Sequence, residues 1–179
     1  MKRFIYFILA CCIVSSCGTL NTPTRVSQYA KMYEEKPLTL LVMPPINNSS
    51  NAEAKDLLYT SINRPLIEAG YYVISPLLAM DILKAESAYD AENFFDAPLD
   101  MFRNFFGADA VVFSVIDTWT KKGMGIETKI RYVIKSTHTN DILFDRSCDL
   151  YLDLSVDSGA SYGLLGAVLD LAASAILTA

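Results

Sequence analysis

The reaction that this sequence predicts most clearly is modification of a cysteine near its start. Two basic residues, Lys2 and Arg3, precede an apolar run at 4–14. Two serines and Cys17 follow, which gives the apolar, small, small, Cys spacing of a lipoprotein signal peptide. We therefore expect cleavage before Cys17, a diacylglyceryl thioether on its sulfur and acylation of its new amino group. Several acyl chains hold a protein on a membrane far more firmly than one chain does.

Two alternatives to this anchor stay open. Cys11 also follows a small residue, but only seven apolar residues precede it. An ordinary secretory signal with three incidental cysteines would have the same charge and apolar pattern. An uncleaved anchor fits less well, because a helix needs about 20 residues to cross a hydrocarbon core of about 30 Å. Gly18, rather than Asp, after the cysteine indicates the outer membrane of a Gram-negative cell.

The remaining polar residues offer little for catalysis. His138 is the only histidine and falls in a predicted turn, so neither a His-dependent triad nor a multi-histidine metal site can be built. A group of acids could hold calcium or act as a carboxylate pair, but it lacks the spacing of a calcium loop and is more typical of a solvated face. These acids are Asp81, Glu86, Asp90, Glu92, Asp96, Asp100 and Asp109. We predict no enzyme, no metal and no cofactor.

Cys148 is the one cysteine of the mature chain besides Cys17, so no disulfide framework is available. It points to the apolar side of its predicted strand. We interpret it as a small core residue rather than a reactive thiol.

The segment 46–51 is the loop whose position best fits a ligand site. It leaves the carboxyl end of the first predicted strand and leads into a helix, where open α/β sheets bind ligands. Asn47, Asn48, Ser49 and Ser50 would supply the polar groups. The alternative is a turn and helix cap built from the same side chains, which Asn and Ser favour.

Hydrophobic patterning predicts the elements that position these residues. An apolar run at 38–43 indicates a strand buried on both faces. A helix is predicted over about 51–69, with Ser50 as its cap, a bend at Pro65 and a stop at Gly70.

The next elements complete a crossover. A strand at 71–74 comes one helix after the first strand, which indicates a right-handed parallel β-α-β unit. Ser75 and Pro76 begin another helix, with the hydroxyl as cap and the proline in the first turn, and it ends near Glu86. A third short helix covers 99–106 and stops at Gly107.

Three strands follow. The run at 110–116 is apolar on both faces and indicates an interior strand, whereas 126–135 and 142–153 alternate and should each have one wet face. Opposite charges on these wet faces should pair across the strands: Lys129 and Arg131 with Asp145 and Asp149. The element order β-α-β-α-α-β-β-β-α predicts a single α/β (α+β) domain with a mixed sheet.

Charge and length restrict the class further. The whole chain has 15 basic and 20 acidic residues, a net charge of −5; without residues 1–16 it loses Lys2 and Arg3 and no acid, which gives −7. This balance opposes nucleic-acid binding, and the remaining length suits one domain. We expect four segments: the signal peptide 1–16, Cys17 with a tether over 17–37, an α/β domain over 38–157, and an apolar C-terminal helix over 158–179.

Apolar spacing also occurs outside the predicted domain. Tyr29, Met32 and Tyr33 share helical spacing and could dock a short helix on the domain. Near the end of the chain, Gly159, Gly163 and Gly166 would let another backbone approach one face of a helix. The opposite side has an apolar stripe, formed by Leu165, Val168, Leu169 and Ile176. We expect this helix to pack on the sheet or on a second subunit. A membrane span is the alternative, which the mid-helix charge of Asp170 disfavours.

Four sequence segments are similar to those of a known family: M-P-P-I-N-N-S-S, P-L-I-E-A-G-Y-Y-V, F-G-A-D-A-V-V-F and Y-G-L-L-G-A-V. They resemble a lipoprotein family of unknown function typified by a neisserial surface-exposed lipoprotein antigen, over about 37–168. The resemblance implies a fold like the amino-terminal domain of TolB, shared in outline with the curli-secretion lipoprotein. It also implies a homodimer, no enzymatic activity and a chain that continues beyond the small-residue helix.

We therefore predict an outer-membrane-anchored lipoprotein, facing the periplasm or exposed on the surface. It would act as a non-catalytic binding or assembly module of a cell-envelope transport or secretion complex, with a second copy or other envelope lipoproteins as partners. The alternative is a periplasmic small-ligand binder or enzyme in which a concave pocket joins the loop 46–51 to nearby acids. A pore subunit would need membrane-inserting hairpins, whereas both predicted hairpins carry charge.

Overall fold

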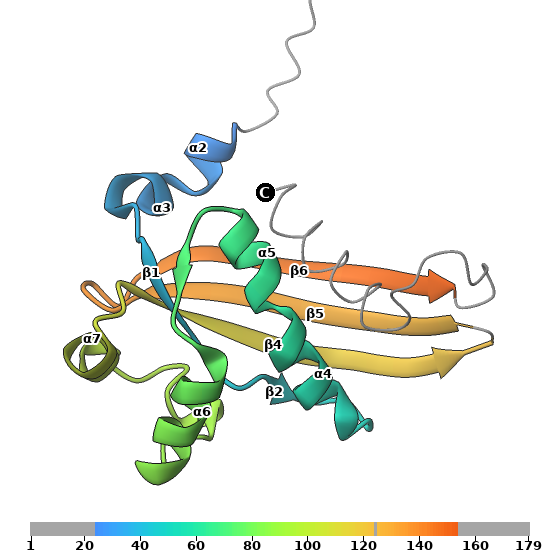
Figure 1. The fold of residues 1–179 in the computed structure, drawn as a ribbon. Coiled ribbons are helices and arrows are strands. Elements are labelled where there is room, and N and C mark those ends of the chain that lie inside the picture. Colours follow the sequence, from blue (N-terminus) through green and yellow to red (C-terminus); the bar gives the residue numbers. More distant parts are fainter. Residues whose placement is uncertain (1–23, 124, 154–179) are drawn as a thin grey trace, which may run out of the picture.

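The computed structural model describes residues 24–123 and 125–153, which form one mixed sheet with helices on both faces (Figure 1). Two short helices come first: α2 (Arg25–Gln28) and α3 (Ala30–Glu35). The first half of the domain then contains β1 (Thr39–Val42), β2 (Ile46–Asn47), α4 (Glu53–Ser61), α5 (Asn63–Glu68), β3 (Tyr72–Val73) and α6 (Pro76–Ala85). The second half contains the 3-10 turn η1 (Ala91–Asn93), α7 (Asp100–Phe106), β4 (Ala110–Lys122), β5 (Gly125–Ser136) and β6 (Ile142–Asp153).

The strand order is β3-β1-β4-β5-β6, and β2 also pairs with β4. The strands β3, β1 and β2 run parallel to their neighbours, whereas β4, β5 and β6 form an antiparallel meander. The predicted α/β class, the mixed sheet and the parallel β-α-β unit are therefore confirmed. The short strand β2 lies where the sequence predicted only a loop, with Ile46 opposite Val115.

Alternation along the central strands divides the core into two layers. In β1, Leu40 packs on one face with Leu58 of α4, whereas Leu41 packs on the other face with Leu83 of α6. Successive side chains of a strand point to opposite faces. Since helices cover both faces, both sets are buried, which explains the uninterrupted apolar run.

The helix predicted over 51–69 is two helices. The first, α4, ends at Ser61, and α5 begins at Asn63, because Pro65 has no N–H to donate to the Ser61 carbonyl and its ring crowds that group. The break therefore comes one turn before the proline. The predicted stop at Gly70 is confirmed: its φ is +95°, and its N–H donates to the Ile67 carbonyl.

Two predicted caps are wrong. At α4, the Asn51 side chain rather than Ser50 accepts the Glu53 N–H, at 2.9 Å. At α6, Pro76 lies in the first turn as predicted, but the Ser75 hydroxyl makes no capping hydrogen bond. Asn51 is one residue closer to the helix than Ser50, so its longer side chain reaches the free amide.

The prediction that β5 and β6 each expose one face to solvent is confirmed only in part. In β5, Lys129 is exposed, but Val133 and Lys135 farther along the same face are buried opposite Phe113 and Val111 of β4. The aromatic segment before α7 covers them, which strand alternation alone could not reveal. In β6, the register shifts opposite Ile134 and Lys135, so Leu143 is buried and Ile142 is 49% exposed, contrary to the predicted alternation.

The predicted cross-strand ion pairs are confirmed. Arg131 makes two hydrogen bonds with Asp145, at 2.8 and 2.5 Å, and Lys129 Nζ lies 4.0 Å from Asp149. Within the described ranges, no helix is long and apolar enough to cross a membrane.

Candidate functional site

The amino-terminal helices dock onto the domain. The ring centroids of Tyr29 and of Phe144 in β6 lie 4.9 Å apart, and Lys31 Nζ lies 2.8 Å from Asp141 Oδ1. The Thr139 hydroxyl donates to the Glu35 carboxylate at 2.8 Å. The docking predicted from the spacing of Tyr29, Met32 and Tyr33 is confirmed, but it uses two short helices instead of one.

Local sequence explains how this segment turns into the sheet. Thr24 caps α2, because its side chain accepts the N–H of Ser27. At the end of α3, Lys36 adopts a left-handed conformation with φ 47° and donates its N–H to the Met32 carbonyl. Pro37 follows and cannot continue a helix. The chain therefore leaves α3 directly into β1.

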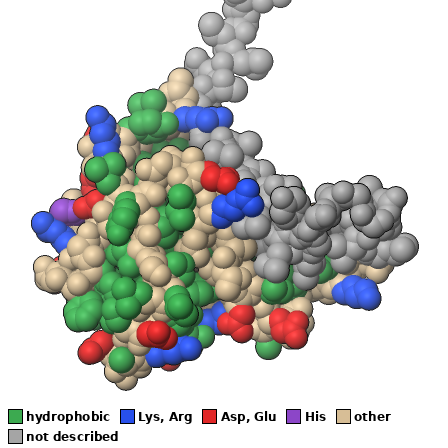
Figure 2. Space-filling model, in the orientation of Figure 1, with side chains coloured by type: hydrophobic (Ala, Val, Ile, Leu, Met, Phe, Trp, Pro, Cys, Tyr) green, Lys and Arg blue, Asp and Glu red, His purple; other side chains and the backbone are tan. Residues whose placement is uncertain are grey.

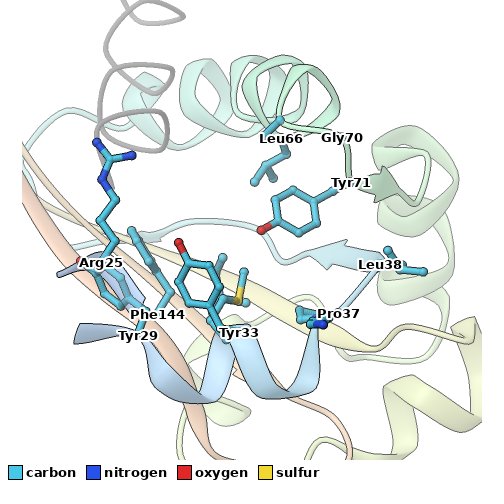
Figure 3. Close-up of a pocket in the computed structure, with 13 residues that line it drawn as sticks. Arg25, Tyr29, Tyr33, Pro37, Leu38, Leu66, Gly70, Tyr71 and Phe144 are labelled. Atoms are coloured by element: carbon cyan, nitrogen blue, oxygen red, sulfur yellow. The ribbon is translucent and has the colours of Figure 1, made fainter. Parts of the chain in front are cut away.

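A groove with a volume of about 520 Å³ lies between these helices, the end of α5 and the sheet (Figure 3). This is within the usual range for small-molecule sites. Its apolar wall includes Met32, Leu66, Ile134 and Phe144. Tyr33 and Tyr71 come from opposite sides and direct their rings and hydroxyls into the space between α3 and α5 (Figure 3).

The charged residues that line this groove are Arg25 and Lys36. None of the described residues that line it is an acid, although the whole chain has a net charge of −5. Burial, and then the neighbouring Tyr33, raise the pKa of Tyr71. Its hydroxyl therefore keeps its proton at neutral pH and can donate a hydrogen bond.

The segment 46–51 is closed by its own side chains. Asn47 donates from Nδ2 to the Asn51 carbonyl at 2.7 Å, and its Oδ1 accepts from the N–H and hydroxyl of Ser49 at 3.0 and 2.7 Å. These bonds favour the turn-and-cap alternative. A ligand-binding role for Asn47, Asn48, Ser49 and Ser50 stays a prediction.

The acids between positions 81 and 109 do not gather. Within the described part of the chain, no three acidic, histidine or cysteine side chains lie close enough to hold a metal ion. Asp109 has a local role instead: its carboxylate accepts the N–H groups of Leu38 and Thr39 at 3.0 and 2.9 Å. Burial opposes ionisation of Asp109, but these two bonds and His138, at 3.7 Å, outweigh it and lower its pKa.

Cys148 contacts the core cluster that contains Phe144 and Tyr132 and is half-buried. Burial raises the pKa of its thiol, which does not favour the reactive thiolate. The proposed lipid acceptor Cys17, its rival Cys11 and the stripe formed by Leu165, Val168, Leu169 and Ile176 lie outside the described residues.

Residues 27–178 match the family described as "Putative lipoprotein GNA1162-like". The chain belongs to this family. The curated relative "Putative lipoprotein NMB1124/NMB1162" from Neisseria meningitidis serogroup B is 28% identical over 116 residues, which are 65% of this chain and 53% of the relative. The chain thus spans about half the length of this relative. The relative is named as a lipoprotein and not by an enzymatic activity.

Solved structures share the fold. Lipoprotein GNA1162 from Neisseria meningitidis aligns with a TM-score of 0.62 and 20% identity, over 80% of this chain and 100% of that chain. A PelC dodecamer from Paraburkholderia phytofirmans aligns with a TM-score of 0.54 and 12% identity, over 78% of this chain and 86% of that chain. These two likenesses show the fold alone. TolB from Acinetobacter baumannii gives a weaker match, with a TM-score of 0.38 and 11% identity, over 79% of this chain and 27% of that chain.

Sequence reasoning did not find the groove. The spacing of Tyr29, Met32 and Tyr33 predicts a docking face, but these residues are far in sequence from Tyr71 and Phe144. The available signal was the position of Tyr29 and Tyr33 between Arg25 and Lys36. Only the pairing of β1 with β3 shows that these tyrosines meet.

Proposed function

We propose that this chain is an outer-membrane-anchored, non-catalytic assembly module of a cell-envelope transport or secretion complex. The observation that carries the proposal is an apolar edge surface, defined here as Leu38, Ile67, Tyr72, Leu77 and Leu78. Each of these side chains is more than half exposed, with Leu77 at 76% and Tyr72 at 71%. Large apolar side chains that are exposed along one edge of a domain are typical of protein–protein interfaces.

The apolar edge surface follows the open edge of the sheet. Strand β3 is the outermost strand on the parallel side, and the Tyr72 N–H donates to the Leu38 carbonyl. Because Tyr72 pairs with Thr39, the Tyr72 and Leu38 side chains lie on opposite faces of this edge. Ile67 precedes β3 on α5, and Leu77 and Leu78 follow it on the first turn of α6. Figure 2 shows hydrophobic side chains gathered on the face that carries β3, α6 and α7.

The partner we propose for this surface is a second copy of the chain. Most soluble oligomers are homo-oligomers, and a self-complementary apolar patch is enough to form one. The dodecamer named for PelC, which shares this fold, supports such an assembly. The lipid on Cys17 would hold the subunits on one membrane surface, where their effective concentration is high.

Mass measurement on the full-length lipoprotein in detergent tests this assembly. We expect an oligomer that Leu77→Asp dissociates, because an unpaired charge would be buried at the contact. The control Ile142→Asp, at an exposed apolar residue on β6, should leave the mass unchanged. A wild-type chain that stays monomeric over the whole concentration range, or equal effects of both variants, would contradict the proposal.

A photo-reactive amino acid at position 77 tests the partner in cells. We expect cross-links between two copies of this chain. If only a different envelope protein is recovered, then the surface binds that protein and the homo-oligomer is wrong.

The anchor is tested separately by metabolic labelling with an alkyne fatty acid. Cys17→Ser should abolish labelling and release the protein from the membrane, whereas Cys11→Ser should retain both. The reverse result would identify Cys11 as the lipid acceptor.

A further inference from the structure

The groove beneath α2 and α3 borders the apolar edge surface at Leu38, which belongs to both, but its other described lining residues are not part of that surface. Its wall is apolar, formed by Met32, Leu66, Ile134 and Phe144, which suits a hydrocarbon chain. We infer that this groove binds a single-chain anionic lipid, a fatty acid or a lysophospholipid. The acyl chain would lie along the apolar wall, and the anionic head group would meet Arg25 and Lys36.

The charged residues that line the groove favour an anionic lipid head group. Arg25 and Lys36 are exposed, and among the described residues no carboxylate forms an ion pair with either of them. The neighbouring cation on α3, Lys31, is paired with Asp141 and does not line the groove. Two cations that no described carboxylate neutralises attract an anion, and a guanidinium and an ammonium suit both carboxylate and phosphate oxygens.

The phenols supply polar contacts inside the groove. Neither Tyr33 nor Tyr71 donates its hydroxyl to another described residue, although Tyr71 is half-buried and both face the groove (Figure 3). A bound head group or glycerol oxygen would accept these protons. A purely hydrophobic protein partner would leave both hydroxyls and both cations without partners, which costs affinity.

The position of the groove also favours a lipid. Arg25 is eight residues after the proposed anchor Cys17, and eight extended residues span at most roughly 28 Å. The groove would therefore stay near the bilayer surface, where fatty acids and lysophospholipids are produced and exchanged. The inference uses the anchor only as support, because a soluble chain could bind the same ligand from solution.

Photo-labelling tests the ligand directly. Full-length protein in phosphatidylcholine nanodiscs would be exposed to a palmitic acid that carries a diazirine in its chain, and the labelled peptides would be mapped by mass spectrometry. We expect label on the peptides that contain Met32 and Tyr71. The matching diazirine hexadecanol, which has no charge, should label them at least about tenfold less at equal concentration, the factor expected from one lost charge-assisted hydrogen bond.

Two variants with matched controls connect this labelling to the groove. Arg25→Gln with Lys36→Gln should remove the preference for the acid over the alcohol, whereas Arg103→Gln with Lys121→Gln, at exposed cations elsewhere, should retain it. Ala69→Phe should fill the groove and abolish labelling by both probes. Ala85→Phe, at the end of α6, is the control for the added ring and should label like the wild type.

Competition separates the two sources of the ligand. Unlabelled lysophosphatidylglycerol should displace the probe if the head group is a phosphate, and unlabelled palmitate should displace it if the site prefers a carboxylate. Displacement by either confirms the single-chain anionic lipid.

Three results would overturn the inference: label spread over the surface, equal labelling by acid and alcohol, or unchanged labelling in Ala69→Phe. A photo-reactive residue at position 71 that cross-links to residues 154–179 or to a second protein chain would also do so. The oligomer mass should be the same in the groove variants and the wild type, so loss of labelling with an intact oligomer separates this site from the apolar edge surface.

Discussion

The parallel and antiparallel halves of the sheet follow different rules. In the parallel half, β1 and β3 are two to four residues long, and β1 is covered by α4 on one face and α6 on the other. In the antiparallel half, β5 and β6 have 12 residues each, and an exposed face of these two strands carries ion pairs. The strand β4 belongs to both: residues 110–114 are all buried, whereas only Ile116 and Trp119 are buried in the rest of the strand.

The difference shows that the cover on a strand, rather than its pairing, sets its sequence pattern. Where helices lie on both faces, every position is apolar or small, and stability comes from packing. Where one face of the strands is exposed to solvent, charged residues occupy that face, and their ion pairs contribute little to the stability of the fold. Mutations in the two halves should therefore have effects of different size.

The largest effect is expected at the doubly covered part of β4. Phe113 is fully buried, and its ring packs edge to face on Phe95 with centroids 5.3 Å apart. Phe113→Ala should lower the free energy of unfolding by about 3–5 kcal/mol, because it removes buried apolar surface and leaves a cavity. The control Phe105→Ala, at a ring that is 62% exposed, should change it by less than about 0.5 kcal/mol. Denaturant unfolding checks both, and similar losses would contradict the comparison.

A smaller effect is expected where β5 passes from exposed to covered. Lys135 is 6% exposed, and its Nζ donates to the Phe95 carbonyl at 2.7 Å. Lys135→Ala should cost about 1–3 kcal/mol, because that carbonyl loses its donor. Lys129→Ala, on the exposed end of the same face, is the matched control and should have almost no effect. Thermal unfolding checks both variants. If Lys135→Ala and Lys129→Ala lower the melting temperature equally, then the contact of Lys135 with the aromatic segment does not stabilise the fold.

Acid should destabilise the start of β1. Burial opposes ionisation of Asp109, but the N–H groups of Thr39 and Leu38 and the nearby His138 lower its pKa below the ordinary value of 3.8. A carboxyl whose pKa is lower in the folded state stabilises the fold above its unfolded pKa, and this contribution is lost as the pH falls through the folded pKa. Stability should therefore fall below about pH 4.

Unfolding measured at a series of pH values checks this. Asp109→Asn keeps an oxygen acceptor but cannot titrate, so its stability should depend less on pH in the acid range than that of the wild type. Asp96→Asn, at an exposed acid, should keep the wild-type slope. An unchanged slope in Asp109→Asn would show that other carboxylates control the acid response.

The smallest effect is expected at the exposed ion pair of the antiparallel half. Arg131 and Asp145 are bidentate, but their side chains are 40% and 36% exposed, so solvent screens their attraction. A double-mutant cycle with Arg131→Ala and Asp145→Ala should give a coupling of about 0.2–1 kcal/mol. The coupling free energy should be smaller still in 1 M salt. A coupling above about 2 kcal/mol at low salt would contradict the comparison, because the exposed face would then stabilise the fold as much as the covered face does.

The sequence by itself determined the family and most of the local elements, with the exceptions of β2 and of the break between α4 and α5. Apolar runs, alternation and the stops at Gly70 and Gly107 indicated which segments are strands and helices, because these signals act over a few residues. The ion pairs of β5 and β6 could also be predicted, since the turn between the strands fixes which residues face each other.

Tertiary structure decided the rest. The burial of Val133 and Lys135 depends on the aromatic segment that crosses them, and the groove depends on α3, α5 and β6 meeting beside β1. The exposure of Leu77 and Tyr72 depends on β3 being the edge strand. These features join residues that are far apart in the chain, and a one-dimensional pattern gives only their spacing along the chain, not the neighbours that cover them in space.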